Sequence, residues 1–167
     1  MKTLHNQHLP EFVAKIKEES NERVKLELWG RKWNLVIKGL PGSSAETPKE
    51  TEVKFRTFLK TELKLSGEHV DSILLQAIHR LPSGDIHSRN FIVRFMSLID
   101  RDMVMKSAMG NLKAGCGKAV MTDLTPELSK LRGALLKKRR EMAPSLKAKT
   151  KLVYLKDAPF LELVPRK

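Results

Sequence analysis

The heptapeptide RNFIVRF, Arg89–Phe95, has the two-residue periodicity of a half-buried β-strand. Large apolar residues occupy positions 91, 93 and 95 (Phe, Val, Phe), whereas Asn90 and Arg94 stand on the opposite alternation with an isoleucine between them. We therefore expect one face of this strand to enter a core, and the other face to carry amide, aliphatic and basic side chains.

A second run of β-type residues, WNLVIKGL at Trp33–Leu40, ends at the turn signal Pro41-Gly42. With the leucine and isoleucine at positions 35 and 37 pointing inward, Asn34, Val36 and Lys38 face outward. The outward residues of both strands are therefore candidates for a binding surface.

Two helices and two more strands are expected around these segments. TPKE at Thr47–Glu50 is a capping box with proline at the first helical position, so a helix is expected from Pro48 to Leu65. The other expected elements are a strand at Leu75–Leu81, a helix from Ser97 to near Gly110, and a strand at Lys118–Met121. The order βαββαβ predicts an α+β, ferredoxin-like domain over residues 31–122, with the first and third strands in the centre.

Residues 1–30 precede this domain and are expected to form a helix. Glu11–Leu28 is rich in Glu and Lys and has an imperfect heptad rhythm of apolar residues. This pattern fits either the remnant of a coiled coil or a single amphipathic helix that packs on its own domain.

Residues 123–167 follow the domain and are more basic. After Thr125-Pro126 we expect a helix that ends at Pro144, and then a hairpin of Lys151–Lys156 with Phe160–Val164. Between residues 132 and 151 the only acid is Glu141, so we expect a small basic helix-plus-hairpin domain.

The composition favours a polyanionic partner and argues against catalysis. Among 167 residues there are 32 Lys and Arg but 19 Asp and Glu, a formal charge of +13 that suits nucleic acid or an acidic membrane face. No run approaches the roughly 18 apolar residues of a membrane span, and Met1–Pro10 lacks the apolar core of a secretory signal. Cys116 is the only cysteine and the five histidines match no ligand spacing, so we expect no metal and no cofactor. Because GxxxxGK[ST], HExxH and GxSxG motifs are all missing, we expect no enzyme.

The outward residues of the two central strands favour single-stranded RNA, although the signature is incomplete. RNA recognition motifs place base-stacking aromatic residues on this face, where the present sequence has Asn90, Ile92 and Val36. A noncanonical RNA recognition motif of this kind would depend on phosphate contacts. The alternative is a structural assembly protein, in which the N-terminal helix oligomerises and the sheet face binds protein.

The segments NLVIKGLP, IHRLP, RNFIVRF, DLTPELSKLR and KLVY occur in an order that resembles the first-open-reading-frame protein of LINE-one type retrotransposons, the transposase-22 family. The resemblance covers about Arg31 to Val164. It implies a trimeric, RNA-binding nucleic-acid chaperone, with a coiled coil, a noncanonical RNA recognition motif and a C-terminal domain, that coats element RNA into a ribonucleoprotein. Val36 departs from the family, in which arginine can stand at this position, and the coiled coil is reduced to Glu11–Leu28.

The resemblance also implies roles for single residues. Asn34, Arg80, Arg89 and Arg94 match polar or basic positions around the strands, Arg132 matches an RNA-contacting arginine, and Tyr154 matches an aromatic residue of the hairpin. Together with the basic residues of the two predicted domains, the predicted nucleic-acid-binding residues are Asn34, Lys38, Arg80, Arg89, Arg94, Arg132, Arg139, Arg140, Lys149 and Tyr154. The expected ligand is single-stranded RNA, with single-stranded DNA as the alternative. We expect the chain in cytoplasmic ribonucleoprotein particles, with the nucleus as a second location.

Overall fold

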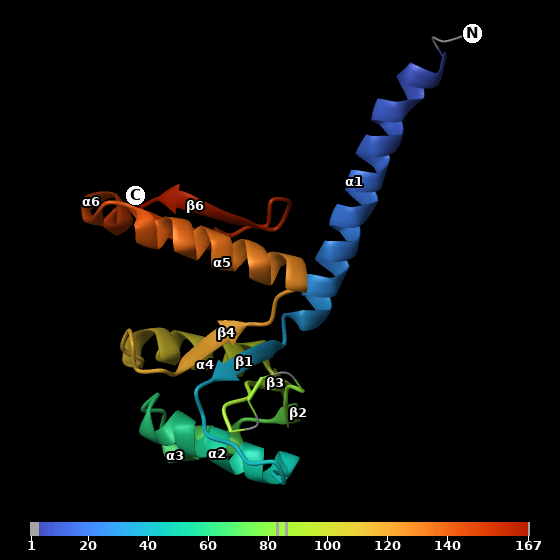
Figure 1. Ribbon diagram of the computed structural model, residues 1–167. Helices are drawn as coiled ribbons and strands as arrows, with labels where there is room; N and C mark the ends of the chain where they lie inside the picture. Colours follow the sequence, from blue (N-terminus) through green and yellow to red (C-terminus); the bar gives the residue numbers. More distant parts are fainter. Residues whose placement is uncertain (1–3, 83, 86, 167) are drawn as a thin grey trace. The chain divides into compact units, whose positions relative to one another are not determined.

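A computed structural model describes residues 4–82, 84–85 and 87–166 of this α+β chain (Figure 1). The chain divides into two compact units. The sheet unit is Arg31–Asp123, and the helix–hairpin unit joins the residues up to Gly30 with those from Leu124 onward. The N-terminal helix therefore belongs to the same compact unit as the C-terminal segment.

The sheet unit contains one four-stranded antiparallel sheet with strand order β2-β3-β1-β4 (Figure 1). Its elements are, in chain order, β1 (Asn34–Lys38), α2 (Pro48–Thr61), α3 (Gly67–Ser72), β2 (Leu75–Arg80), β3 (Phe91–Phe95), α4 (Leu98–Asn111) and β4 (Ala119–Thr122). The four predicted strands and two predicted helices of this region are confirmed, whereas the short helix α3 was not expected. As predicted, β1 and β3 are the central strands.

Local sequence signals fix where the helices of this unit begin. The Thr47 side chain accepts a hydrogen bond from the Glu50 amide and the Glu50 side chain accepts from the Thr47 amide, so the predicted capping box is formed. Ser97 caps α4 in the same way, by accepting from the Asp100 amide. α2 ends at Thr61, short of the predicted Leu65, and Lys64 then turns the chain with a positive φ of 59°.

The core of the sheet unit lies between the inner face of the sheet and the helices α2 and α4. It is built from alternate residues of the central strands and from one face of each helix: Leu35, Ile37, Phe91, Val93 and Phe95 with Phe55, Phe58, Leu59, Val104 and Ala108. The Phe55 ring meets the rings of Phe91 and Phe95 edge-on, with centroids 6.0 and 6.2 Å apart. The predicted alternation of inward and outward residues in β1 and β3 is therefore confirmed.

The helix–hairpin unit is organised around a smaller apolar cluster. Its elements are α1 (Leu4–Arg31, whose last residue belongs to the sheet unit), α5 (Pro126–Glu141), α6 (Pro144–Ala148), β5 (Thr150–Tyr154) and β6 (Leu161–Pro165). Leu128, Phe160 and Leu161 form the buried centre, and Val24 and Leu28 of α1 pack against it. The predicted helix after Thr125 and the predicted hairpin are confirmed, with Thr150 paired to Pro165 and Tyr154 to Leu161. The short helix α6 was not expected.

The two ends of α1 differ in how they use their apolar residues. Val24 and Leu28 are partly buried in the cluster, as a packed amphipathic helix requires. Leu9, Phe12 and Ile16 are 62 to 64% exposed. No helix in the described part of the chain is both long and apolar enough to cross a bilayer.

Replacing Phe55 by alanine should destabilise the sheet unit by about 3 to 5 kcal/mol, because a fully buried ring between Phe91 and Phe95 is lost and a cavity remains. Val53→Ala on the same helix is the matched control, since Val53 is 60% exposed, and it should change stability by less than about 0.5 kcal/mol. Urea unfolding followed by Trp33 fluorescence, in a Trp29→Phe background, measures both. Equal losses would contradict the assignment of the core.

Candidate nucleic-acid interface

The outer face of the sheet carries three rows of side chains that cross the strands. In the middle row the strand register places His79 beside Ile92, Ile92 beside Val36, and Val36 beside Met121. The polar row, formed by the paired residues Asn34 and Arg94, lies on one side of the middle row, and Lys38 of β1 lies on the other side. The helices α2 and α4 contribute their buried residues to the core on the inner face. We define the outer face by seven residues: Asn34, Val36, Lys38, His79, Ile92, Arg94 and Met121.

The polar row is held in place by a chain of hydrogen bonds. Arg94 donates from Nε to Gln76 Oε1 at 2.7 Å and from Nη1 to Asn34 Oδ1 at 3.2 Å. Asn34 in turn donates from Nδ2 to Asp123 Oδ2 at 2.9 Å, and Arg31 Nη1 donates to Asp123 Oδ1 at 2.9 Å. Because Asp123 is buried, these two donors satisfy a carboxylate that would otherwise be costly. Asn34 and Arg94, both predicted site residues, are thus brought together, with Asn34 orienting the guanidinium.

Arg80, the third predicted residue, has a different environment. Its side chain is 7% exposed, and Nε donates to Glu46 Oε1 at 3.0 Å. Nη1 donates to the carbonyls of Leu40 and Arg89, and Nη2 donates to the Pro41 carbonyl and to Glu46 Oε2. A guanidinium has five N–H groups, and these contacts engage all of them. Arg80 therefore holds chain segments together and has no N–H group left for a ligand.

Glu46 is the counter-ion of Arg80, and its side chain is 2% exposed. It also accepts hydrogen bonds from Lys54 and from the Thr51 hydroxyl. Burial alone would raise the pKa of Glu46, but the hydrogen bonds from Arg80, Lys54 and Thr51 outweigh it and lower the pKa to about 2. Glu46 is therefore ionised at neutral pH inside the protein.

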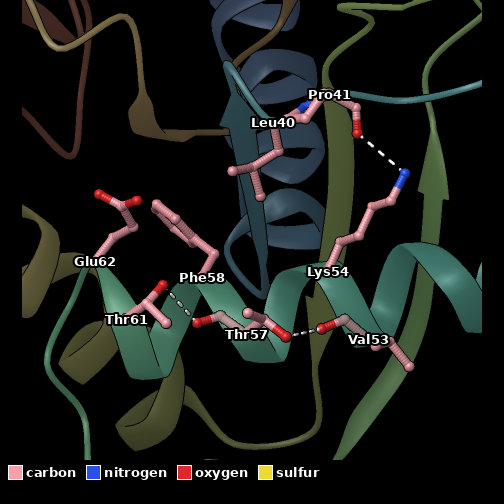
Figure 2. Close-up of a pocket in the computed structure, with 8 residues that line it drawn as sticks. All are labelled: Leu40, Pro41, Val53, Lys54, Thr57, Phe58, Thr61 and Glu62. Carbon is pink, nitrogen blue, oxygen red and sulfur yellow. Dashed lines mark hydrogen bonds between the residues drawn. The ribbon is translucent and has the colours of Figure 1, made fainter.

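A pocket of about 280 Å³ lies between α2 and the end of the β1 segment (Figure 2). Leu40 and Phe58 face each other across it, and Lys54 donates to the Pro41 carbonyl at its rim at 3.1 Å (Figure 2). The hydroxyls of Thr57 and Thr61 donate to carbonyls one turn earlier in α2. Both hydroxyls and the lysine amine of this pocket are therefore engaged with backbone carbonyls.

The two remaining predicted residues of the sheet unit are Lys38 and Arg89. Lys38 is exposed at the end of β1. Arg89 is half-buried just before β3, its carbonyl accepts from Arg80 Nη1 at 2.7 Å, and its Nε has no hydrogen-bond partner among the described residues. Both residues flank the strand ends at which Arg80 is bound.

The other predicted residues belong to the helix–hairpin unit. Arg139 donates from Nε to the Thr150 carbonyl and from Nη2 to the Lys147 carbonyl, each at 3.2 Å, so it fastens α5 to the start of the hairpin. Tyr154 is 51% exposed. Of the last three residues, Arg132 is half-buried and Arg140 is exposed on α5, and Lys149 is exposed directly after α6.

Four side chains that shape these surfaces were not among the predicted site residues. Gln76 and Asp123 hold Arg94 and Asn34, Glu46 holds Arg80, and His79 occupies the middle row. A β-bulge between Leu75 and Ala77 shifts the register of β2, so simple alternation could not place Gln76. In the described part of the chain, no three His, Cys, Asp or Glu side chains gather as a metal site would require.

The ionised Glu46 predicts how stability depends on acid. Because the pKa of Glu46 is lowered from 4.5 to about 2 in the folded chain, its stabilisation is complete above pH 4.5 and is lost as the pH falls toward 2. Glu46→Gln should be less stable than the wild type at pH 7, and its stability should fall less between pH 5 and pH 3. Urea unfolding followed by Trp33 fluorescence in the Trp29→Phe background measures this, with Glu68→Gln, which changes an exposed glutamate of α3, as control. The same pH dependence in wild type and Glu46→Gln would contradict the role of Glu46.

Comparison with known proteins does not assign this interface. No model of a known protein family matches the chain, and no curated protein matches it. The function proposed below therefore depends on the residues and the geometry described above.

Proposed function

We propose that this chain binds single-stranded RNA across the outer face of its sheet, as a noncanonical RNA recognition motif of ferredoxin-like topology. The observation that carries the proposal is the outer face itself, where a middle row of His79, Ile92, Val36 and Met121 lies between Arg94 with Asn34 on one side and Lys38 on the other. The order β1-α2-β2-β3-α4-β4, with β1 and β3 central, supports the topology, and α3 is an addition to it. RNA recognition motifs use this face of the sheet.

The spacing of the basic residues suits a strand of phosphates. β1 begins with Asn34 and ends with Lys38, and a rise of about 3.3 Å per residue places these two positions roughly 13 Å apart. Arg94 pairs with Asn34 in the strand register, so the cations Arg94 and Lys38 have a similar separation. Cations at this separation can contact phosphates on either side of a base that rests on the middle row. The seven residues of the outer face include no Phe, Tyr or Trp, so only the imidazole of His79 offers a stacking ring. We therefore expect weak sequence preference and strong salt dependence.

The helix–hairpin unit supplies a second basic surface to the proposal. Between residues 132 and 151 the exposed cations are Lys137, Lys138, Arg140, Lys147, Lys149 and Lys151, and Glu141 is the only acid in this span. Tyr154 adds an exposed ring on which a base could stack. Together with the formal charge of +13 and the resemblance to retrotransposon proteins, these features support a nucleic-acid chaperone that forms part of a LINE-type ribonucleoprotein.

Lys38→Ala tests the outer face. We expect it to weaken binding of a short single-stranded RNA by roughly three- to ten-fold and to lower the salt slope by about one phosphate contact, because a cation of the face is lost. Fluorescence anisotropy at several salt concentrations measures both quantities. Lys106→Ala removes the same charge from an exposed position on α4 and should leave the slope unchanged. Equal effects of the two changes would reduce the binding to general charge attraction, and wild-type binding no tighter to single strand than to duplex would overturn the proposal.

A second candidate function is assembly through α1. The observation that favours it is the exposure of Leu9, Phe12, Val13 and Ile16, which are 58 to 64% exposed at spacings of three and four residues. Such a stripe suits packing against the same helix in other copies of the chain. In the transposase-22 family, which the sequence resembles, this packing makes a homotrimer. We expect sedimentation equilibrium to show a concentration-dependent oligomer that is lost in the double variant Phe12→Gln, Ile16→Gln. A wild-type monomer at every concentration would remove this candidate.

A further inference from the structure

The Arg80 guanidinium joins chain segments that are far apart in the sequence. It lies at the end of β2 and donates to the carbonyls of Leu40 and Pro41, which follow β1, and to that of Arg89, which precedes β3. The segments after β1 and before β3 are also joined directly, because the Gly42 amide donates to the His87 carbonyl at 2.8 Å. The ends of three strands are therefore fastened at one buried point.

Glu46 extends this junction to α2. The carboxylate receives Arg80 Nε, and it also accepts from Thr51 and Lys54 of the helix. A buried guanidinium needs a counter-charge and a partner for each N–H group, so removing Glu46 leaves the Arg80 guanidinium without its counter-charge. The fit is close, since a Cβ at Gly42 would lie 2.9 Å from the Arg80 Cζ atom.

We propose that Arg80 and Glu46 are positioning residues for the nucleic-acid interface. They act through Lys38, two residues before the Leu40 carbonyl, and through Arg89, whose own carbonyl Arg80 binds. The pair fixes the backbone from which these two cations reach the phosphates, and it touches no ligand itself. This inference rests on the proposed function and deepens it, because it names the groups that preorganise one end of the interface.

The other end of the interface offers an internal comparison. Arg94 is oriented by Gln76 and Asn34, a separate set of hydrogen bonds. In the register of β1 with β3, Arg94 pairs with Asn34 and Phe91 pairs with Ile37, so Arg94 and Arg89 lie toward opposite ends of the central strands. A loss of the Arg80–Glu46 pair should therefore disturb Arg89 and leave Arg94 in place.

Glu46→Gln in the full chain separates positioning from simple charge. The change makes the protein more positive, so electrostatic attraction alone predicts tighter binding to single-stranded RNA, whereas loss of positioning predicts binding about five-fold weaker with a smaller salt slope. Glu68→Gln makes the same charge change at an exposed site on α3 and should not weaken binding. Measurements are made at temperatures where Trp33 fluorescence shows each variant folded, since partial unfolding lowers affinity without lowering the slope. Unchanged or tighter binding of Glu46→Gln would overturn the inference.

Double-mutant cycles identify the residue through which the pair acts. Arg89→Ala should cost clearly less affinity in the Glu46→Gln background than in the wild type, because Arg89 is already displaced there. Arg94→Ala should cost the same in both backgrounds. If the losses of binding free energy caused by Glu46→Gln and Arg89→Ala were simply additive, the inference that the pair acts through Arg89 would be overturned. If Glu46→Gln does not fold, Arg80→Lys replaces it, because lysine keeps the charge but cannot form the five-donor fork.

Hydrogen exchange distinguishes failure of the inference from failure of the proposed function. The Gly42 amide, bonded to His87, and the Leu81 amide, bonded to the Asn90 carbonyl, should exchange faster in Glu46→Gln, whereas the Phe95 amide, bonded to the Trp33 carbonyl, should not. Unchanged exchange at Gly42 and Leu81 overturns positioning whether or not RNA binds. Faster exchange in a chain whose wild type binds no single-stranded RNA overturns the proposed function and, with it, the role assigned to the pair in binding.

Discussion

The burial of alternate side chains of β1 and β3 against α2 and α4 is the constraint on which the rest of the sheet unit depends. Leu35 and Ile37 face inward from β1, and Phe91 and Phe95 close around Phe55 from β3. Because side chains alternate in a strand, a slip of one residue would move this whole set into solvent. The core therefore fixes the register, and the register in turn fixes which polar residues share the opposite face.

Arginines at three positions in this chain show how tertiary surroundings decide what a charge does. Arg94 is held at the outer face by Gln76 and Asn34, where a ligand can meet it. Arg80 has all five donors engaged inside the sheet unit, and Arg139 binds the carbonyls of Thr150 and Lys147. A fork of five donors can cross-link several loop carbonyls at once, which a lysine cannot do. A basic residue near a binding face is therefore as well suited to building that face as to touching a ligand.

An interface without large aromatic residues has consequences for the proposed binding mode. The middle row of His79, Ile92, Val36 and Met121 has three apolar side chains and one imidazole, so little affinity can come from stacking. Affinity must then come from phosphates, whose contribution scales with the number of correctly placed cations and falls with salt. When stacking contributes little, affinity depends more strongly on how well the cations are held in place. The hydrogen-bonded networks around Asp123 and Glu46 hold residues of the proposed interface in this way.

The sequence by itself determined the α+β class, the strands and main helices of the sheet unit, the capping box at Thr47 and the inward faces of β1 and β3. These features are local, since alternation and caps act within a few residues of the chain. The short helices α3 and α6 were not expected, although Ser66 caps the first and Pro144 begins the second, whereas the β-bulge in β2 and the partners of each arginine were decided only by tertiary structure. Glu46 and Arg80 are 34 residues apart in the sequence, and Asn34 and Arg94 are 60 residues apart. Hydrogen bonds between such distant groups leave no periodic pattern in a sequence, so only the fold shows which arginines bind backbone carbonyls and which are held at the outer face of the sheet.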